Sequence, residues 1–214
     1  MALTPGQARR FYDRFGRAQD LQAFYEDRAI GELLAHASFP AARSVFELGC
    51  GTGRLAATLL ARELPADARY LGADISGTMT GLSGARLRGF GRRAQVIRAD
   101  GTMRFPVADG GWDRFLAVYV FDLLSAQDAR AAVAEASRLL RPGGLLCAVS
   151  LAPGTTPVTR LVSRAWAAVW RRAPGLVGGC RPISLRPFLG GWHVEHRALV
   201  SAWGLTSEVV IAAR

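Results

Sequence analysis

Short runs of apolar and β-branched residues alternate, from residue 44 onward, with segments whose apolar residues recur at helical spacing. The helical segments predict one helix at about 54–62 and another beginning after Ser125, where Asp128 completes a capping-box pattern. Strands that alternate with helices pair in parallel through right-handed crossovers. The pattern therefore predicts an open α/β sheet with helices on both faces. Its buried strands are expected at 44–48, 69–73, 94–99, 115–120 and 145–151.

This alternation stops after residue 151. The next segment, 152–192, is rich in Trp, Gly and Pro, and its apolar spacing predicts one amphipathic helix over 158–172. Two alternating runs, 193–202 and 207–213, then close the chain. They predict a β-hairpin that adds an antiparallel strand at the sheet edge.

The strand at 44–48 runs into Gly49, Gly51 and Gly53, immediately before the first helix. Glycines there let the backbone turn sharply and let a ligand approach the main chain. A phosphate-binding loop of the GxxxxGK[ST] type is excluded because the chain contains no lysine. The dinucleotide fingerprint GxGxxG fits poorly because Arg54 stands where its last glycine belongs. A strand, turn and helix with incidental glycines remains a structural alternative.

Three acidic residues lie at the carboxyl ends of predicted strands, where open α/β sheets bind their ligands. Glu47 stands two positions before the first glycine, and Asp74 follows the second strand, 21 residues beyond Gly53. A carboxylate at Asp74 can accept hydrogen bonds from both hydroxyls of a ribose. Asp100 follows the third strand and precedes Gly101. The structural alternatives are a helix N-cap at Asp74 or Ser76 and a simple turn at Asp100.

Together these residues resemble the motifs of class I S-adenosylmethionine-dependent methyltransferases. The resemblance implies a Rossmann-like, seven-stranded α/β sheet, mostly parallel with the last strand antiparallel, and S-adenosylmethionine as the cofactor. The ammonium and sulfonium of this cofactor suit Glu47, which would repel a pyrophosphate. The matching segments are Val45-Phe46-Glu47-Leu48-Gly49-Cys50-Gly51-Thr52-Gly53, Asp74-Ile75-Ser76-Gly77-Thr78-Met79, Ala99-Asp100-Gly101 and Leu139-Leu140-Arg141-Pro142-Gly143-Gly144.

The resemblance also implies the residues of the cofactor site. Ile75 and Met79 would pack on the adenine ring, Asp74 would bind the ribose, and Asp100 would accept a hydrogen bond from the adenine amino group. The turn at 139–144 is structural. The full set of expected cofactor contacts is Glu47, Gly49, Cys50, Gly51, Gly53, Asp74, Ile75, Met79, Asp100, Gly101 and Tyr119.

Asp122, just past the fourth strand, lies where the family places groups on the acceptor side. It can act as a general base, bind a cationic acceptor or merely cap the following turn. The sequence Asn-Pro-Pro-Tyr is absent here, which argues against an exocyclic base amine as the acceptor.

The N-terminal aromatic runs at 11–15 and 24–26 resemble the lid of small-molecule methyltransferases of the ubiquinone/menaquinone and phosphatidylethanolamine kinds. In such a lid, Tyr12 or Tyr25 would lie near the sulfonium, because an aromatic face attracts a cation. Tyr12 and Asp122 are therefore the candidate catalytic residues. The alternative is an amphipathic helix that packs its aromatic residues on the sheet.

Positive charge is in excess mainly in the last third of the chain. All 27 basic residues are arginines. The chain has 17 acidic residues, so its net charge is +10. Residues 151–214 carry eight arginines and two acidic residues, whereas residues 1–150 carry 19 and 15. The helix at 158–172 has Trp166 and Trp170 on its apolar side and arginines opposite. It can cap an acceptor pocket, lie on an anionic membrane surface, or do both.

Side chains that bind metals or form disulfides are few. Cys50, Cys147 and Cys180 are scattered and lack CxxC spacing, so we expect a reducing compartment and no metal site. His193 and His196 are assigned to the edge hairpin. No apolar run is long enough for a membrane span, and no signal peptide is expected. The expected location is the cytoplasm, with peripheral contact at the inner membrane surface as an option.

The sequence thus predicts methyl transfer to a small, apolar or lipid-like acceptor, such as an aminophospholipid or an isoprenoid quinone precursor. One alternative is methylation of a protein or nucleic acid, against which the lack of a recognition module argues. Another is a cofactor-binding, non-catalytic protein of the membrane surface. Within one domain over 1–214, we expect lid helices at 1–40, a cofactor-binding core at 41–151, an acceptor-side cap at 152–192 and a closing hairpin at 193–214.

Overall fold

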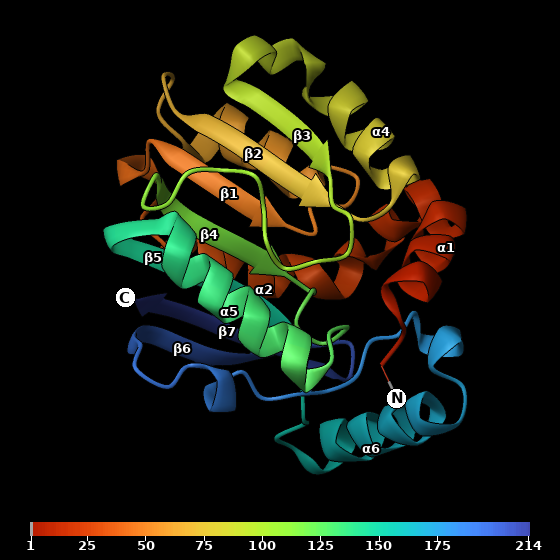
Figure 1. The fold of residues 1–214 in the computed structure, drawn as a ribbon. Coiled ribbons are helices and arrows are strands. Elements are labelled where there is room, and N and C mark those ends of the chain that lie inside the picture. The colour runs from red at the N-terminus through yellow and green to blue at the C-terminus, as the bar shows by residue number, and fades with distance from the viewer. Residues whose placement is uncertain (1) are drawn as a thin grey trace.

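The computed structural model describes residues 2–214 and has a seven-stranded sheet at its centre (Figure 1). The strand order is β3-β2-β1-β4-β5-β7-β6. All pairings among β1 to β5 are parallel, whereas β7 is antiparallel to both of its neighbours. This confirms the predicted fold class. The strands are β1 (Ser44–Leu48), β2 (Arg69–Asp74), β3 (Ala94–Arg98), β4 (Trp112–Val118), β5 (Leu140–Ala152), β6 (His193–Ala202) and β7 (Leu205–Ala213).

Helices cover both faces of the sheet. The helix α5 packs on one face, and α2, α3 and the end of α4 pack on the other. The helix α1 lies where the arrowheads of β1 to β3 point, and α6 lies outside the layers (Figure 1). The helices are α1 (Pro5–Phe15), α2 (Ala23–His36), α3 (Arg54–Thr58), α4 (Gly77–Leu87), α5 (Ala126–Leu139) and α6 (Pro157–Arg172). Single helical turns occur at η1 (Gly16–Gln22), η2 (Phe39–Ala41), η3 (Leu59–Glu63), η4 (Arg88–Arg93), η5 (Pro174–Val177) and η6 (Arg186–Phe188).

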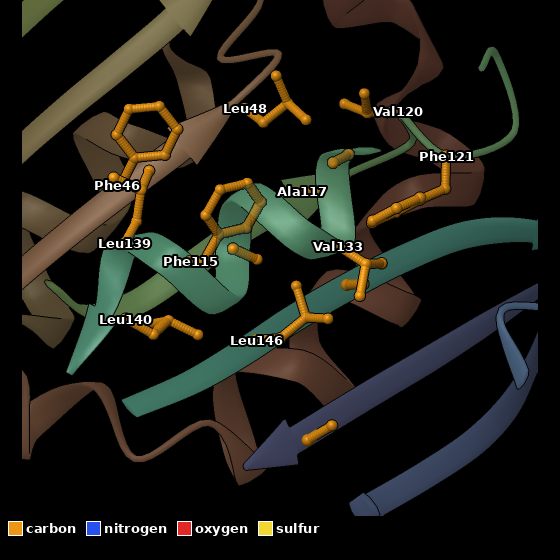
Figure 2. Packing of buried hydrophobic residues seen from close by; sticks show 14 of the residues in the cluster. Phe46, Leu48, Phe115, Ala117, Val120, Phe121, Val133, Leu139, Leu140 and Leu146 are labelled. Atoms are coloured by element: carbon orange, nitrogen blue, oxygen red, sulfur yellow. The ribbon is translucent and has the colours of Figure 1, made fainter. Parts of the chain in front are cut away.

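The alternation of side chains along the strands builds two cores. Phe46 and Leu48 of β1 point to the α5 face, together with Phe115 of β4 (Figure 2). Val45 points to the opposite face and joins the core beneath α2 and α3. Because successive side chains of a strand point to opposite faces, a strand covered on both sides is apolar throughout. This explains why all five residues of β1 are buried.

The predicted elements are all present, and most of them have shifted ends. Ser125 caps α5 as expected, because its hydroxyl accepts the Asp128 N–H at 3.1 Å. The first predicted helix continues through a π-helical turn to Glu63. The strand β4 begins at Trp112, earlier than predicted, because a bulge lets Trp112 pair with Leu140 before the regular register starts. The same pairing lengthens β5 to include the Pro-Gly-Gly turn.

The hairpin lies at the edge of the sheet and its pairing is antiparallel, as predicted. The prediction did not specify the order of its strands: β7 is inserted between β5 and β6, and β6 forms the edge. The physical reason is burial: residues 206–212 are all buried, whereas β6 alternates between exposed and half-buried residues. Among the helices of residues 2–214, none combines the length and apolarity that a bilayer span requires.

Candidate functional site

The glycine loop between β1 and α3 adopts a conformation that only glycine takes without strain. Gly49, Gly51 and Gly53 have φ angles of 73°, 51° and 74°. A Cβ atom at Gly49 would collide with the side chain of Val120, and one at Gly53 would lie 2.5 Å from the Ser83 hydroxyl. The backbone of this loop therefore requires glycine at these positions, whether or not a ligand is bound. The backbone of the loop lies open to whatever occupies the adjacent cavities.

Asp74 connects this loop to the end of β2. One carboxylate oxygen accepts the Gly51 N–H and the other accepts the Ser76 N–H, both at 2.9 Å. The helix cap is Ser76, whose hydroxyl accepts the Met79 N–H at 3.1 Å. Each Asp74 oxygen thus keeps a second lone pair for a ligand. Burial raises the pKa of the Asp74 carboxyl, and the backbone hydrogen bonds oppose that shift.

A cavity lies at the carboxyl ends of β1 to β3, and we call it the strand-end cavity. The N-terminal segment closes its other side with Leu3, Pro5, Ala8 and Tyr12. Most of the wall is apolar, and Asp74 contributes a carboxylate to it. This combination suits a flat heterocycle joined to a sugar. The sheet side of the wall is formed by Leu48, Gly49, Ala73, Asp74, Ile75, Ala99, Gly101, Met103, Phe105 and Val120.

Three expected cofactor residues, Gly53, Met79 and Asp100, line neither the strand-end cavity nor the cavity beside the glycine loop. Met79 is buried in the body of the protein and is not part of the wall. The Asp100 side chain is exposed, and its carboxylate accepts the N–H and the hydroxyl of Thr102 at 2.8 and 2.7 Å. Asp100 is thus satisfied within its own turn, as the turn alternative anticipated. Its neighbour Gly101 does line the cavity.

A second cavity, which we call the loop cavity, holds buried carboxyl groups. Glu47 accepts the hydroxyl of Tyr70 at 2.5 Å, and burial raises its pKa to about 7. Glu26 of α2 lines the same cavity, with Arg54 at 3.4 Å, and burial likewise raises its pKa to about 7. Such groups gain stability from a cation nearby. Cys50 and Gly51 lie in the wall between them.

Sequence reasoning did not assign Glu26 to the site, although it belongs to the aromatic run at 24–26. The signal available was one acidic residue beside two aromatic residues at the start of an amphipathic helix. That signal does not separate an exposed helix position from a buried one. The fold places Glu26 inward because α2 packs on the sheet through Ala29, Ile30 and Leu33.

The N-terminal segment is tied across the site by two aspartates. Asp13 of α1 accepts the Ser76 hydroxyl at 2.6 Å, and Asp20 of η1 accepts the Thr52 hydroxyl at 2.5 Å. No residue of α1 is fully buried, so this helix does not pack into a core as an ordinary surface helix would. It instead covers the strand-end cavity, which is the position expected of a lid.

A third cavity, the cap cavity, lies between the lid and the segment after β5. Tyr12 and Tyr119 line all three cavities and so stand at their junction. Tyr119 has a left-handed φ of 54°, and its hydroxyl lies 2.7 Å from that of Ser207. Tyr25 sets its ring edge against Tyr119, with centroids 5.6 Å apart. Burial raises the pKa of the Tyr12 phenol, which therefore stays neutral and offers an aromatic wall.

Asp122 lies in the wall of the cap cavity and is fully buried. One carboxylate oxygen accepts the Leu151 N–H at 3.3 Å, and the other has no hydrogen-bond partner among residues 2–214. The side chain thus contacts β5 and does not cap the turn that follows it. Burial raises its pKa to about 7. A group that titrates near neutral pH and has a free oxygen can accept a proton from a bound molecule.

Comparison with known proteins identifies the kind of domain and the cofactor. Residues 45–144 match the family described as a methyltransferase domain. These residues thus belong to a class I S-adenosylmethionine-dependent methyltransferase domain. Its cofactor is S-adenosylmethionine, and solved structures of this fold contain the demethylated product S-adenosylhomocysteine. An adenosine would suit the apolar strand-end cavity, and the cationic methionine part would suit the acidic loop cavity.

Two curated relatives act on different acceptors. The tRNA N(3)-methylcytidine methyltransferase Mettl2 of Drosophila melanogaster is 26% identical over 150 residues, 65% of this chain and 46% of the relative. The ubiquinone/menaquinone biosynthesis C-methyltransferase UbiE of Desulfotalea psychrophila is 33% identical over 121 residues, 56% of this chain and 46% of the relative. The chain therefore spans less than half the length of either relative.

The fold of the methyltransferase is also similar to that of the [4+2]-cyclase SpnF. The two structures share 16% sequence identity, with a TM-score of 0.72 over 100% of this chain and 97% of the other. At this identity the likeness concerns the fold. The acceptor must be argued from the side chains around the cap cavity.

Proposed function

We propose that the protein transfers the methyl group of S-adenosylmethionine to a small, apolar or lipid-like acceptor bound in the cap cavity. The observation that carries this proposal is the composition of that cavity. Its wall is mostly aromatic and aliphatic, and its volume is about 160 Å³. Asp122 is the one charged residue in it. The other wall residues include Phe11, Phe15, Tyr25, Tyr119, Leu151, Trp166, Leu176, Val177 and Leu205.

The cap helix α6 supports an enclosed acceptor site. Its two tryptophans turn inward: the indole N–H of Trp166 donates to the Cys180 carbonyl, and that of Trp170 donates to the Gly179 carbonyl, both at 2.9 Å. Arg181 donates to the carbonyls of Asp122 and Leu124 and lies 5.1 Å from the Trp170 ring. These contacts fix the cap segment beside the cavity. They also engage the Arg181 guanidinium within the protein.

The chemistry required of the protein is modest. When bound, S-adenosylmethionine supplies a methyl group already activated on a sulfonium. The protein has to orient the acceptor in line and keep water out. Tyr12 and Tyr119 stand where the cofactor and acceptor sides meet, and Asp122 can take the proton that an oxygen or nitrogen acceptor loses. The exposed arginines take no part in the transfer of the methyl group.

The outer surface around the cap cavity points to a membrane as the source of the acceptor. The tryptophans of α6 are turned inward, and the exposed apolar face is aliphatic, with Leu161 71% exposed and Val158 67%. Leu176, which also lines the cap cavity, is 81% exposed. At the hairpin turn, Trp203 is exposed and sets its ring against Phe24 at 6.1 Å. An apolar rim of this kind suits insertion at a lipid interface.

Charge favours an anionic lipid surface over a protein partner. Arg160, Arg164, Arg171 and Arg172 of α6 are all exposed. Within the part of the chain that the structure describes, none of them forms an ion pair with an acidic side chain. Arginines beside an apolar helix face are attracted to anionic head groups.

We expect Val158→Asp combined with Leu161→Asp to reduce binding to anionic vesicles roughly tenfold or more. Burial of one aliphatic side chain contributes about 1.5–3 kcal/mol, and each added carboxylate would be repelled by the lipids. The measurement is flotation with vesicles of phosphatidylcholine and phosphatidylglycerol. Leu199→Asp, at an exposed leucine on β6, is the matched control and should float like the wild type. Equal flotation of all three proteins would refute the membrane contact.

The acceptor class itself is tested with cofactor that carries a labelled methyl group. Incubated with separate lipid, small-molecule, protein and RNA fractions of a bacterial lysate, the enzyme should label the lipid or apolar small-molecule fraction. The same fractions incubated without enzyme serve as the control for enzyme-dependent label. Label in RNA would instead favour an acceptor like that of the tRNA methyltransferase relative. Label in protein would likewise overturn the proposal.

A further inference from the structure

Three side chains that line none of the three cavities converge at the C-terminal end of α2. Glu32 and His36 lie one turn apart on that helix, and His196 reaches them from the edge strand β6. One nitrogen or oxygen atom from each lies within 4.8 Å of the other two. The Nε2 atom of His196 is 2.9 Å from Glu32 Oε1, and Nδ1 of His36 is 3.5 Å from the same oxygen. The two imidazole rings are stacked, with centroids 3.7 Å apart and planes 7° from parallel.

An ion pair alone does not account for this arrangement. One carboxylate can pair with one imidazolium, but two imidazolium rings stacked face to face would repel each other. A cation shared by the three side chains would draw both rings to one carboxylate, and the rings would tilt from the stacked arrangement so that their in-plane nitrogen lone pairs meet at the ion. Two imidazoles with one carboxylate suit zinc, nickel, cobalt or copper, whereas magnesium and calcium prefer oxygen ligands alone.

We propose that Glu32, His36 and His196 bind one divalent transition-metal ion. Nδ1 of His36 also lies 2.9 Å from the Glu32 backbone carbonyl, and it would exchange this hydrogen bond for the ion. All three side chains are partly exposed, so water can complete the coordination. Three protein ligands with an open position make a site of moderate affinity.

The position of the three ligands suggests what the ion does. It would join α2 to the edge strand β6, which follows it in the chain by more than 150 residues. The N-terminal turn of α2 carries Tyr25 and Glu26, which line the loop cavity. A metal clamp at the other end of the helix would thus stabilise the fold and hold this part of the site in place. No ligand of the proposed ion takes part in methyl transfer.

The test uses the full chain without an affinity tag. Titration with Co²⁺ should show one saturable ion per chain, with a visible spectrum typical of nitrogen and oxygen ligands. Excess Ni²⁺ or Zn²⁺ should raise the thermal unfolding midpoint by roughly 3–6 °C, because an ion that binds only the folded state stabilises it. His36→Gln and His196→Gln should each weaken the affinity for Co²⁺ roughly tenfold or more.

His193→Gln is the matched control, because His193 is a histidine of the same strand that lies outside the cluster. It should bind Co²⁺ and shift its unfolding midpoint like the wild type. The metal-free midpoints of all variants report whether each still folds. Absence of saturable binding would overturn the proposal, and so would binding that survives both His36→Gln and His196→Gln. A thiolate charge-transfer band would also overturn it, since the ion would then lie at a cysteine.

Discussion

Replacing Asp74 with asparagine should weaken binding of S-adenosylmethionine about 10- to 100-fold. The Asp74 carboxylate has one lone pair free on each oxygen, and these can accept both ribose hydroxyls. A hydrogen bond to a charged group contributes about 1.5–3 kcal/mol, and the amide loses both the charge and one acceptor. Asparagine is preferable to alanine because it can still accept one of the N–H groups that Asp74 now satisfies, those of Gly51 and Ser76. Calorimetric titration with the cofactor measures the change.

Asp100→Asn is the matched control for this experiment. The motif resemblance implies an adenine contact for Asp100, whereas the structure leaves its side chain exposed and bonded to Thr102. We therefore expect affinity within about twofold of the wild type, as for a surface substitution. Unchanged binding in Asp74→Asn would contradict the ribose role. A large loss in Asp100→Asn would show that its turn rearranges when the cofactor binds.

The parts of this fold that sequence predicted best are those fixed by local chemistry. The strand at 44–48 has the predicted bounds because each of its residues is buried by neighbours on both sides. The glycines at 49, 51 and 53 were recognisable because their backbone conformation excludes other residues. Ser125 was recognisable because a helix N-terminus leaves N–H groups that a hydroxyl satisfies.

What the sequence did not predict depends on contacts between distant segments. Whether Asp100 points into the cavity or back to Thr102 is a choice between two rotamers, which a motif does not encode. The order of β7 and β6 depends on which strand gains more by burial beside β5. His36 and His196 meet only because α2 packs across the hairpin, so no spacing along the chain relates them. The inward turn of Trp166 follows from the carbonyl of Cys180, which no periodicity reveals.

The second large effect concerns the pH dependence of stability and activity at Asp122. The folded protein raises the pKa of this carboxyl to about 7, against an ordinary value of 3.8 in an unfolded chain. Between these values the folded state holds a proton that the unfolded state has lost. The stability of the wild type therefore falls as the pH rises from about 4 to 7. Asp122→Asn has no carboxyl to titrate at this position, so its stability should fall less over this pH range and should exceed that of the wild type at pH 8. Glu26 and Glu47, whose pKa values are also raised to about 7, should leave both proteins with a similar remaining dependence of stability on pH.

The same substitution should lower kcat by about 10²- to 10⁴-fold, because the acceptor loses its general base, while the affinity for S-adenosylmethionine stays unchanged. In the wild type, the rate should rise with pH through about 7 as Asp122 ionises, and in Asp122→Asn this rise should disappear. Single-turnover methylation measured from pH 5.5 to 8.5 separates this effect from product release. Full activity in Asp122→Asn would mean that the acceptor reacts without giving up a proton, as a neutral amine can. Lower activity together with lower stability at pH 8 would instead mean that Asp122 holds the cap cavity in shape and is not a base.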